Sequence, residues 1–287
     1  MTEREEMLEQ MVDAMRRYAR EELVPAEDEV ETTEEIPDRI VRQLKEFGLF
    51  GMTVPEEYGG LGLSVYEEVR MVFEITYASP VFRSYFGTTN GVGTLGLVNE
   101  GTDEQRQRYL PRIASGEMMA SFCLSEPDAG SDVASLTTKA VRDGDHRVHM
   151  AAVAAGLCVR LIDEGLKYAE ERVQFGRPIA NFQMIQAMLA ESQAEAYAAR
   201  AMIEKAARDK DAGKDITMES ACCKYFATEA VGRIADRMLQ IHGGNGYIKE
   251  YPIERLYRDV RLLRIYEGTS QVQQLIVARE MRKRRGG

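Results

Sequence analysis

Residues 217–246 read TMESACCKYFATEAVGRIADRMLQIHGGNG and decide the fold of this 287-residue chain. From Thr217 to His242 the sequence has no proline, and apolar residues recur at the spacing of one helix face. Gly243-Gly244-Asn245-Gly246 follows, and glycines are typical of a helix C-terminus. We therefore predict one long helix that ends at His242, followed by a glycine-rich turn.

Similar patterns lie on both sides of this helix. The further predicted helices are Val148–Glu171, Phe182–Asp211, Ile253–Leu263 and Ser270–Arg284. Three of the helices are long, the connections between them are short, and breakers inside them are few. This organisation is typical of an antiparallel four-helix bundle, which we assign to residues 147–287.

The first 120 residues also have helical patterns, which predict an N-terminal helical domain over residues 1–120. Thr2 with Glu5, and Thr102 with Gln105, have the spacing of capping boxes at helix starts. The predicted helices span Met7–Leu23, Pro37–Phe47, Ser64–Tyr77, Pro80–Phe86 and Asp103–Ala114, and the region Gly87–Gly101 is a candidate for another. The Gly- and Pro-rich segment Val54–Gly62 is predicted to be a loop.

The segment 121–146 has a different character. Ser121–Pro127 predicts a short strand broken by proline, Asp128–Asp132 a turn, and Leu136–Val141 a second strand. A Gly-Ser turn offers backbone N–H groups to a phosphate or polar ligand, although it is equally a plain connection. The chain as a whole is expected to be mainly α.

Charge and composition limit the classes of function. The net charge is −10 with a pI near 5.1, and the one basic cluster, Arg279–Arg285, complements the dipole of the last helix. No nucleic acid partner is therefore expected. Four cysteines without CxxC spacing indicate reduced thiols, and the acidic N-terminus does not resemble a signal peptide, so a cytoplasmic location is expected. No apolar run approaches the roughly 20 residues of a membrane span.

Ile265-Tyr266-Glu267-Gly268-Thr269-Ser270-Gln271 precedes the last helix, and Ser270 with Gln273 is predicted to form a capping box there. A carboxylate beside a helix N-terminus can serve as a positioned base. The alternative is that Glu267 is a solvated residue of an interhelical turn.

The connection Glu171–Ile179 contains two residues that a turn explains, Gly176 and Pro178, and two that it does not, Arg172 and Phe175. Gly176 is predicted to cap the preceding helix and Pro178 to open the next one. Arg172 offers a cation for a pyrophosphate, and Phe175 offers a face for an aromatic ring. The turn Gly243–Gly246 is either a helix cap or a backbone cradle for phosphate. The three histidines lack the spacing of metal ligands, so no metal site is expected.

Taken together, five segments in order resemble the acyl-CoA dehydrogenase family of flavoenzymes, and the resemblance extends from about Met7 to Met281. The segments are Pro55-Glu56-Glu57-Tyr58-Gly59-Gly60, Cys123-Leu124-Ser125-Glu126-Pro127-Asp128-Ala129-Gly130-Ser131-Asp132, Glu171-Arg172-Val173-Gln174-Phe175-Gly176-Arg177-Pro178-Ile179, Gln240-Ile241-His242-Gly243-Gly244-Asn245-Gly246-Tyr247 and Tyr266-Glu267-Gly268-Thr269-Ser270-Gln271.

The resemblance implies a role for each matching residue. Glu267 matches the base that removes the α-proton of an acyl-CoA thioester, and the β-hydride passes to N5 of FAD. The residues that match FAD contacts are Phe122, Leu124, Ser125, Gly130, Ser131, Arg172, Gln174, Phe175, Gln240, Gly243, Gly244, Thr269 and Gln271. Those that match substrate contacts are Ser131, Tyr266, Glu267 and Gly268. The resemblance also implies a homodimer or homotetramer and, as electron acceptor, an electron-transfer flavoprotein.

The chain departs from the family between its two helical domains. Family members have a middle β-barrel domain, of which residues 121–146 match only the first strands, and the chain contains no Trp for the strand that packs on the flavin. Three interpretations remain open: a working dehydrogenase with a reduced middle domain, a domain-deleted form with impaired FAD binding, and a non-catalytic helical oligomeric scaffold.

Overall fold

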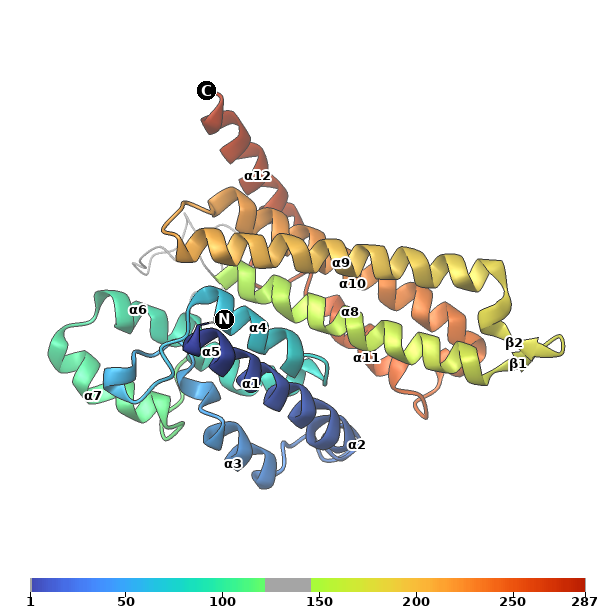
Figure 1. Cartoon of the computed structure of the whole chain (residues 1–287), viewed down its shortest axis with the longest axis horizontal. Coiled ribbons are helices and arrows are strands. Elements are labelled where there is room, and N and C mark those ends of the chain that lie inside the picture. The colour runs from blue at the N-terminus through green and yellow to red at the C-terminus, as the bar shows by residue number, and fades with distance from the viewer. Residues whose placement is uncertain (1, 122–145, 287) are drawn as a thin grey trace, which may run out of the picture. The chain divides into compact units, whose positions relative to one another are not determined.

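The structure is a computed structural model that describes residues 2–121 and 146–286, without the side chains of Val92 and His146. The chain divides into two compact units, Met1–His146 and Arg147–Gly287 (Figure 1). Both units are helical in the part that the structure describes, which confirms the predicted mainly α class. Of the two predicted strands, Ser121–Pro127 and Leu136–Val141, only Ser121 belongs to the described residues.

The first unit contains seven α-helices in its described part. They are α1 (Glu3–Tyr18), α2 (Val24–Thr33), α3 (Asp38–Glu46), α4 (Val65–Ile75), α5 (Pro80–Asn90), α6 (Val92–Glu100) and α7 (Asp103–Ala114). The predicted capping boxes at Thr2 and Thr102 are confirmed. A third box, between Ser64 and Glu67, starts α4. Helix α7 continues through Pro111. The proline removes one helical hydrogen bond, and burial of Leu110 and Ile113 offsets that loss.

The N-terminal helix is longer than the sequence pattern indicated. A π-helical turn over Ala19–Leu23 connects α1 to α2, and the Val24 N–H donates to the carbonyl of Ala19. Pro25 then falls in the first turn of α2, where a residue without an N–H loses no helical bond. The wide turn thus lets the chain pass a proline without leaving the helix.

Apolar packing and two buried carboxylates hold the first unit together. Helix α1 packs on α4, and the largest fully buried side chains include Phe50, Phe82 and Phe86. Arg4 binds Glu67 at 2.6 Å, and Arg16 binds Glu74 at 2.9 Å, across the same pair of helices. The two ion pairs fix how α1 lies along α4.

Helix α10 (Thr217–His242) is the centre of the second unit, with the bounds that the sequence predicted. It packs on α9 (Gln183–Asp211), α11 (Pro252–Leu262) and α12 (Ser270–Arg284). Helix α8 (His146–Glu171) approaches α10 closely at Gly165, where a Cβ would lie 2.2 Å from the sulfur of Met238. These helices form the predicted bundle.

A two-stranded hairpin separates α8 from α9, which corrects two predictions. Strand β1 (Val173–Gln174) pairs antiparallel with β2 (Arg177–Pro178). Phe175 and Gly176 form the turn with φ values of 51° and 76°, a combination that matches the twist of a tight hairpin. Gly176 is therefore a hairpin residue and not the cap of α8. Pro178 does not open α9, because a 3-10 turn over Ile179–Asn181 intervenes.

Candidate functional site

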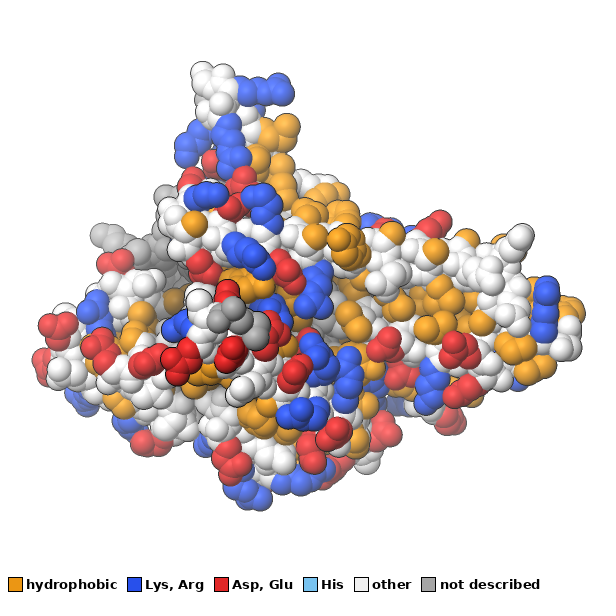
Figure 2. All heavy atoms as spheres, in the orientation of Figure 1, with side chains coloured by type: hydrophobic (Ala, Val, Ile, Leu, Met, Phe, Trp, Pro, Cys, Tyr) orange, Lys and Arg blue, Asp and Glu red, His pale blue; other side chains and the backbone are white. Residues whose placement is uncertain are grey.

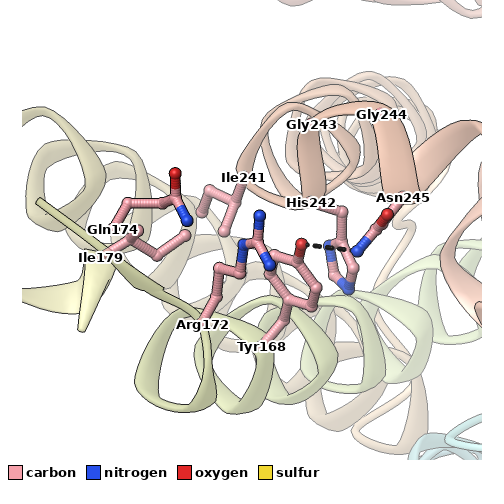
Figure 3. Close-up of a pocket in the computed structure, with 9 residues that line it drawn as sticks. All are labelled: Tyr168, Arg172, Gln174, Ile179, Ile241, His242, Gly243, Gly244 and Asn245. Atoms are coloured by element: carbon pink, nitrogen blue, oxygen red, sulfur yellow. Dashed lines mark hydrogen bonds between the residues drawn. The ribbon is translucent and has the colours of Figure 1, made fainter. Parts of the chain in front are cut away.

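A pocket of about 240 Å³ lies at the end of the bundle where α8 and α10 finish (Figure 3). Its lining residues are Tyr168, Arg172, Gln174, Ile179, Ile241, His242, Gly243, Gly244 and Asn245. Tyr168 and Arg172 come from α8 and the residue after it, whereas the last five come from the end of α10 and the turn that follows. The pocket thus joins two motifs, Glu171–Ile179 and Gln240–Tyr247, that are far apart in the sequence.

Four of the residues predicted to contact FAD line this pocket: Arg172, Gln174, Gly243 and Gly244. Phe175 does not line it; the ring is 93% exposed at the hairpin turn and lies edge-on to Phe182, with centroids 6.0 Å apart. Gln240 is also absent from the lining. The other predicted contacts in the middle segment, Phe122, Leu124, Ser125, Gly130 and Ser131, lie outside the described residues.

An aromatic cluster forms the base of the pocket. The ring of His242 stacks on Tyr168 with centroids 4.2 Å apart, and Tyr251 packs edge-on against both rings. Asn245 donates from Nδ2 to the hydroxyls of Tyr168, at 3.0 Å, and Tyr251, at 3.3 Å. These contacts fix the glycine turn above α8. The place of Tyr168 in the pocket has no sequence signature, since nothing local links this residue to the glycine turn.

His242 is a structural residue as well as a lining residue. It is 4% exposed, and its Nδ1 lies 2.8 Å from the carbonyl oxygen of Met238. Burial lowers the pKa of His242, although the contact with that carbonyl opposes the shift. Among the described residues no cluster of His, Cys, Asp or Glu has the arrangement of a metal site.

Gly243 and Gly244, at the end of α10, differ in the structural feature that requires a glycine. Gly243 has a φ of 59°, in the left-handed region that favours glycine. Gly244 does not share this conformation, and among the described residues beyond its two chain neighbours a Cβ there would meet no atom within 4 Å. Neither backbone conformation nor crowding within the chain requires glycine at position 244. A group that approaches the backbone from outside would require it.

Arg172 supplies positive charge beside these glycines. Its side chain is exposed and forms no hydrogen bond or ion pair with any residue that the structure describes. Figure 3 shows the guanidinium directed into the space between Gln174 and Tyr168. A guanidinium and an open glycine backbone suit an anionic group such as a phosphate. The pocket therefore fits the predicted contact with a pyrophosphate.

The segment that carries Glu267 connects α11 to α12. Glu267 has a φ of 54° and Gly268 a φ of 82°, so two consecutive residues are left-handed. Thr269 is the N-cap of α12 and accepts from the Val272 N–H, whereas the predicted capping box between Ser270 and Gln273 is wrong. The Ser270 hydroxyl instead donates to Glu229 at 2.7 Å. Thr269 competes for the cap because it lies one residue earlier and has an equivalent hydroxyl.

Side chains from α10 and α12 hold this segment. The Lys224 ammonium donates to the Gly268 carbonyl at 2.8 Å, and the Gln273 amide donates to the carbonyls of Glu267, at 3.3 Å, and Gly268, at 3.1 Å. Lys224 is 0% exposed. Burial lowers its pKa to about 8, although the carboxylates of Glu267 and Glu229 oppose the shift. Lys224 has no sequence signature as part of this segment, because it lies 43 residues before Glu267 in the chain.

The remaining predicted residues of this segment occupy different environments. The Glu267 and Gln271 side chains are exposed, whereas Tyr266, Gly268 and Thr269 are half-buried. None of the five lines the pocket at the end of α10. The described part of the unit therefore has two separate functional candidates, the pocket and the segment around Glu267.

Two family models match the chain. The model described as acyl-CoA dehydrogenase, N-terminal domain, matches residues 3–117, and the model described as acyl-CoA dehydrogenase, C-terminal domain, matches residues 144–282. The two matches leave residues 118–143 between them.

Full-length relatives and a solved structure agree with these matches. The chain is 32% identical to a 3-(aryl)acrylate reductase of Clostridium sporogenes, over 98% of this chain and 99% of that protein. It is 30% identical to the caffeyl-CoA reductase-Etf complex subunit CarC of Acetobacterium woodii, over 88% and 91%. An acyl-CoA dehydrogenase complexed with FAD from Bacillus anthracis superposes with a TM-score of 0.87 at 24% identity, over 98% of this chain and 68% of the other.

The alignment with the first relative extends over 377 positions, 90 more than the 287 residues of the chain. The additional positions correspond in size to a small domain. In the described residues no helix is long and apolar enough to cross a membrane.

Proposed function

Because this chain belongs to the acyl-CoA dehydrogenase family, whose cofactor is FAD, we propose that it catalyses α,β-dehydrogenation of an acyl-CoA thioester with Glu267 as the base. Most of the family's middle β domain is missing from the chain. The proposal is therefore that the two helical domains retain the reaction.

The observation that carries the proposal is the geometry of the segment around Glu267. A carboxylate projects from a left-handed turn directly before a helix N-terminus, and two donors from neighbouring helices hold that turn. A left-handed conformation costs a non-glycine residue about 1–3 kcal/mol, so it persists only where the surroundings impose it. Imposed backbone geometry of this kind is concentrated at functional sites.

The chain's own residues have separate tasks in the proposed reaction. When bound, FAD supplies the acceptor for the β-hydride. Glu267 takes the α-proton on a carboxylate oxygen, and Tyr266 and Gly268 contact the thioester on either side of it. The positive end of the α12 dipole favours negative charge that develops on the substrate.

The FAD contacts fall into two groups. We assign the pyrophosphate end to the pocket, where Arg172, Gln174, Gly243 and Gly244 meet and Gln240 lies one turn back on α10. Thr269 and Gln271 serve the end near Glu267. Phe175 projects from the hairpin with an exposed ring, which would be available to the FAD of a second subunit. From the middle segment, Phe122, Leu124, Ser125, Gly130 and Ser131 complete the set.

We propose that the second unit also forms the interface of a homodimer or homotetramer. Figure 2 shows hydrophobic side chains gathered over the long helices of this unit. On α9, Met184 is 77% and Tyr197 is 74% exposed, and the Phe175 ring on the hairpin is almost entirely exposed. Large exposed apolar side chains that recur along one helix are typical of a contact with a partner. Sedimentation velocity distinguishes a monomer from a dimer or tetramer.

The named relatives favour a second direction for the same chemistry. Both of the relatives described above are reductases, and one is a subunit of a reductase-Etf complex. In the reverse reaction Glu267 donates the proton to the α-carbon of an enoyl thioester, because the same group serves both directions. An electron-transfer flavoprotein is then the proposed redox partner. Anaerobic assays in both directions with a panel of thioesters identify the preferred one.

The decisive experiment is reduction of bound flavin by substrate. The purified protein is incubated with FAD, freed of excess cofactor, and mixed anaerobically with acyl-CoA while the absorbance of the oxidised flavin is followed. Glu267→Gln should retain FAD and lose the bleaching by about 10²-fold or more, in line with the contribution of a general base. Glu250→Gln, a change at an exposed carboxylate of the same unit, is the control.

Three outcomes would contradict the proposal. Protein that stays colourless after incubation with FAD supports the non-catalytic scaffold. Flavin that binds but is not bleached by any acyl-CoA supports the impaired, domain-deleted form. Unchanged bleaching in Glu267→Gln rejects Glu267 as the base.

A further inference from the structure

Lys224 is a buried cation that the proposed reaction does not use. It lies on α10 with a fully buried side chain, and its ammonium donates to the backbone carbonyl of Gly268. Burying an ammonium is costly unless the group is hydrogen-bonded and near opposite charge. Here the nearby opposite charges are the carboxylates of Glu267 and of Glu229 on the same helix. A lysine in this position thus needs an explanation beyond packing.

The Lys224 bond acts on the residue pair that has the special backbone conformation. Gly268 follows Glu267, and both are left-handed. Gln273 reaches the same carbonyl from α12, and a Cβ on Gly268 would lie 2.6 Å from its amide nitrogen. The Gly268 oxygen therefore accepts from two side chains on two helices. Two donors on one oxygen restrict rotation of the peptide plane between Gly268 and Thr269, one residue after Glu267.

Other residues already attach the segment to α10. Arg264 donates to the carbonyls of Thr228 and Glu229 at 3.4 Å, and Ser270 donates to the Glu229 carboxylate. These contacts lie before and after Glu267 in the chain. Lys224 is not needed to hold the two ends of the segment on the helix. Its contact lies at the middle of the segment, next to the carboxylate.

We propose that Lys224 is a positioning residue for Glu267, which fixes the left-handed pair Glu267-Gly268 through the Gly268 carbonyl and places a positive charge near the carboxylate. The inference rests on the proposed role of Glu267 as the base and deepens it. An ammonium beside a carboxylate favours the ionised form of that carboxylate, which is the form that accepts a proton. The Gln273 amide supplies the geometric part of this function without the charge.

The test separates geometry from charge with two variants. Lys224→Met removes donor and charge at similar volume, and Lys224→Gln keeps a donor without the charge. Lys205→Met, at an exposed lysine on α9 that pairs with Asp209, is the matched control. Circular dichroism and the flavin content report folding, and both are expected to match wild type, because an apolar residue is tolerated at a buried ionic position.

Hydrogen exchange measures the position of the segment without any cofactor. In the protein free of FAD, Lys224→Met should speed exchange of amides in residues 265–270 by about tenfold or more, the effect of losing a charge-assisted bond. Lys205→Met should leave these rates unchanged. Equal rates in wild type and Lys224→Met would overturn the geometric part of the inference.

The pH profile of flavin reduction by acyl-CoA measures the contribution of charge. Both Lys224 variants should move the acidic limb to higher pH, because Glu267 then loses a neighbouring cation. The charged groups that face Lys224 are Glu267, Glu229 and, through its pair with Glu229, Arg264. An acidic limb that does not move in either variant would overturn the electrostatic part. If Lys224→Met does not fold, Lys224→Gln decides the electrostatic part, and Lys224→Ala, which also lacks the donor, decides the geometric part by exchange.

The failure of this inference differs from the failure of the proposed function. If Glu267 is not the base, Glu267→Gln bleaches normally, whereas the exchange comparison still decides whether Lys224 orders the segment. If Glu267 is the base and Lys224 does not position it, Glu267→Gln is inactive and the Lys224 variants behave as wild type in exchange and in pH dependence.

Discussion

The guanidinium of Arg264 lies against the backbone of Gly232. A Cβ on Gly232 would come within 1.8 Å of Nη2 and 2.5 Å of Cζ of Arg264, so the glycine makes room for this side chain. From there Arg264 donates to two carbonyls of α10, and it pairs with Glu229 at 3.5 Å. The contact fixes the start of the segment that carries Glu267.

Gly232→Ala tests this contact. In an exposed helix the change stabilises by about 1 kcal/mol, through propensity. Here we expect no gain or a net loss, because the new methyl group displaces Arg264 from its two carbonyls. In an Arg264→Met background the same change should recover the stabilisation. Thermal unfolding of the two single variants and the double variant measures the coupling, and simple additivity would contradict the prediction.

Gly244→Ala should separate cofactor binding from stability. Because the added Cβ meets no atom within 4 Å in the described part of the chain apart from its immediate neighbours, the unfolding free energy should change by less than about 0.5 kcal/mol. If FAD approaches this backbone, its affinity should fall by about tenfold or more, as for a lost hydrogen bond to a charged group. Titration followed by flavin fluorescence measures the affinity.

Gly246→Ala is the matched control for that experiment. A Cβ at Gly246 would lie 2.6 Å from the Leu239 carbonyl oxygen, so this variant should unfold more easily. Equal FAD affinity in wild type and Gly244→Ala would reject the assignment of the glycine turn to the cofactor.

The ion pair between Arg4 and Glu67 should make the first unit sensitive to acid. The hydrogen bond from Arg4 lowers the pKa of Glu67, even though partial burial opposes the shift. A carboxyl whose folded pKa is lowered stabilises the fold above its unfolded pKa, and this contribution is lost as the pH falls through the folded pKa. Near pH 7, Arg4→Met should destabilise by about 0.5–1 kcal/mol, because Arg4 is half exposed.

The difference in unfolding free energy between wild type and Arg4→Met should therefore shrink as the pH falls below about 4.5, the usual pKa of a Glu carboxyl. Urea unfolding at a series of pH values measures it. A difference that is the same at pH 3 and pH 7 would show that the guanidinium contributes through packing and not through charge.

The charge of Lys224 should affect stability in the alkaline range, with the same sign as Glu67: stability rises with pH. Burial lowers its pKa from 10.5 to about 8, so the folded state binds a proton at this site less tightly than the unfolded state. The resulting cost to stability is fully present below pH 8 and disappears as the pH rises from 8 to 10.5. It amounts to at most about 3 kcal/mol.

Lys224→Met removes this cost. Relative to wild type, the variant should therefore be most stable below pH 8, and its advantage should decrease toward pH 10.5. Denaturant unfolding at pH 7 and pH 10 measures the two differences, with Lys205→Met as control. An advantage that grows with pH would contradict the buried, charged state of Lys224.

Much of the helical architecture follows from local sequence. The ends of α7, α10 and α12 agree with the prediction, since apolar periodicity, threonine caps and the glycine turn are all local signals. The hairpin after α8 was missed because Phe175 in a left-handed conformation has no local signature; the strands on either side impose it. The extension of α1 through the π-helical turn was missed for a similar reason, since packing of Leu23 and Ala26 favours it over a break at Pro25.

The sequence by itself determined that the chain is mainly helical, where most of the helices begin and end, and which motifs identify the family. Only the tertiary structure decided which of the motif residues meet. It brings Arg172 and Gln174 to Gly243 and Gly244 in one pocket and leaves Phe175 outside it. It also places Lys224 under the Gly268 carbonyl. The physical reason is that periodicity and capping act over a few residues, whereas these contacts depend on which helix faces pack together, and residues far apart in the chain determine that packing.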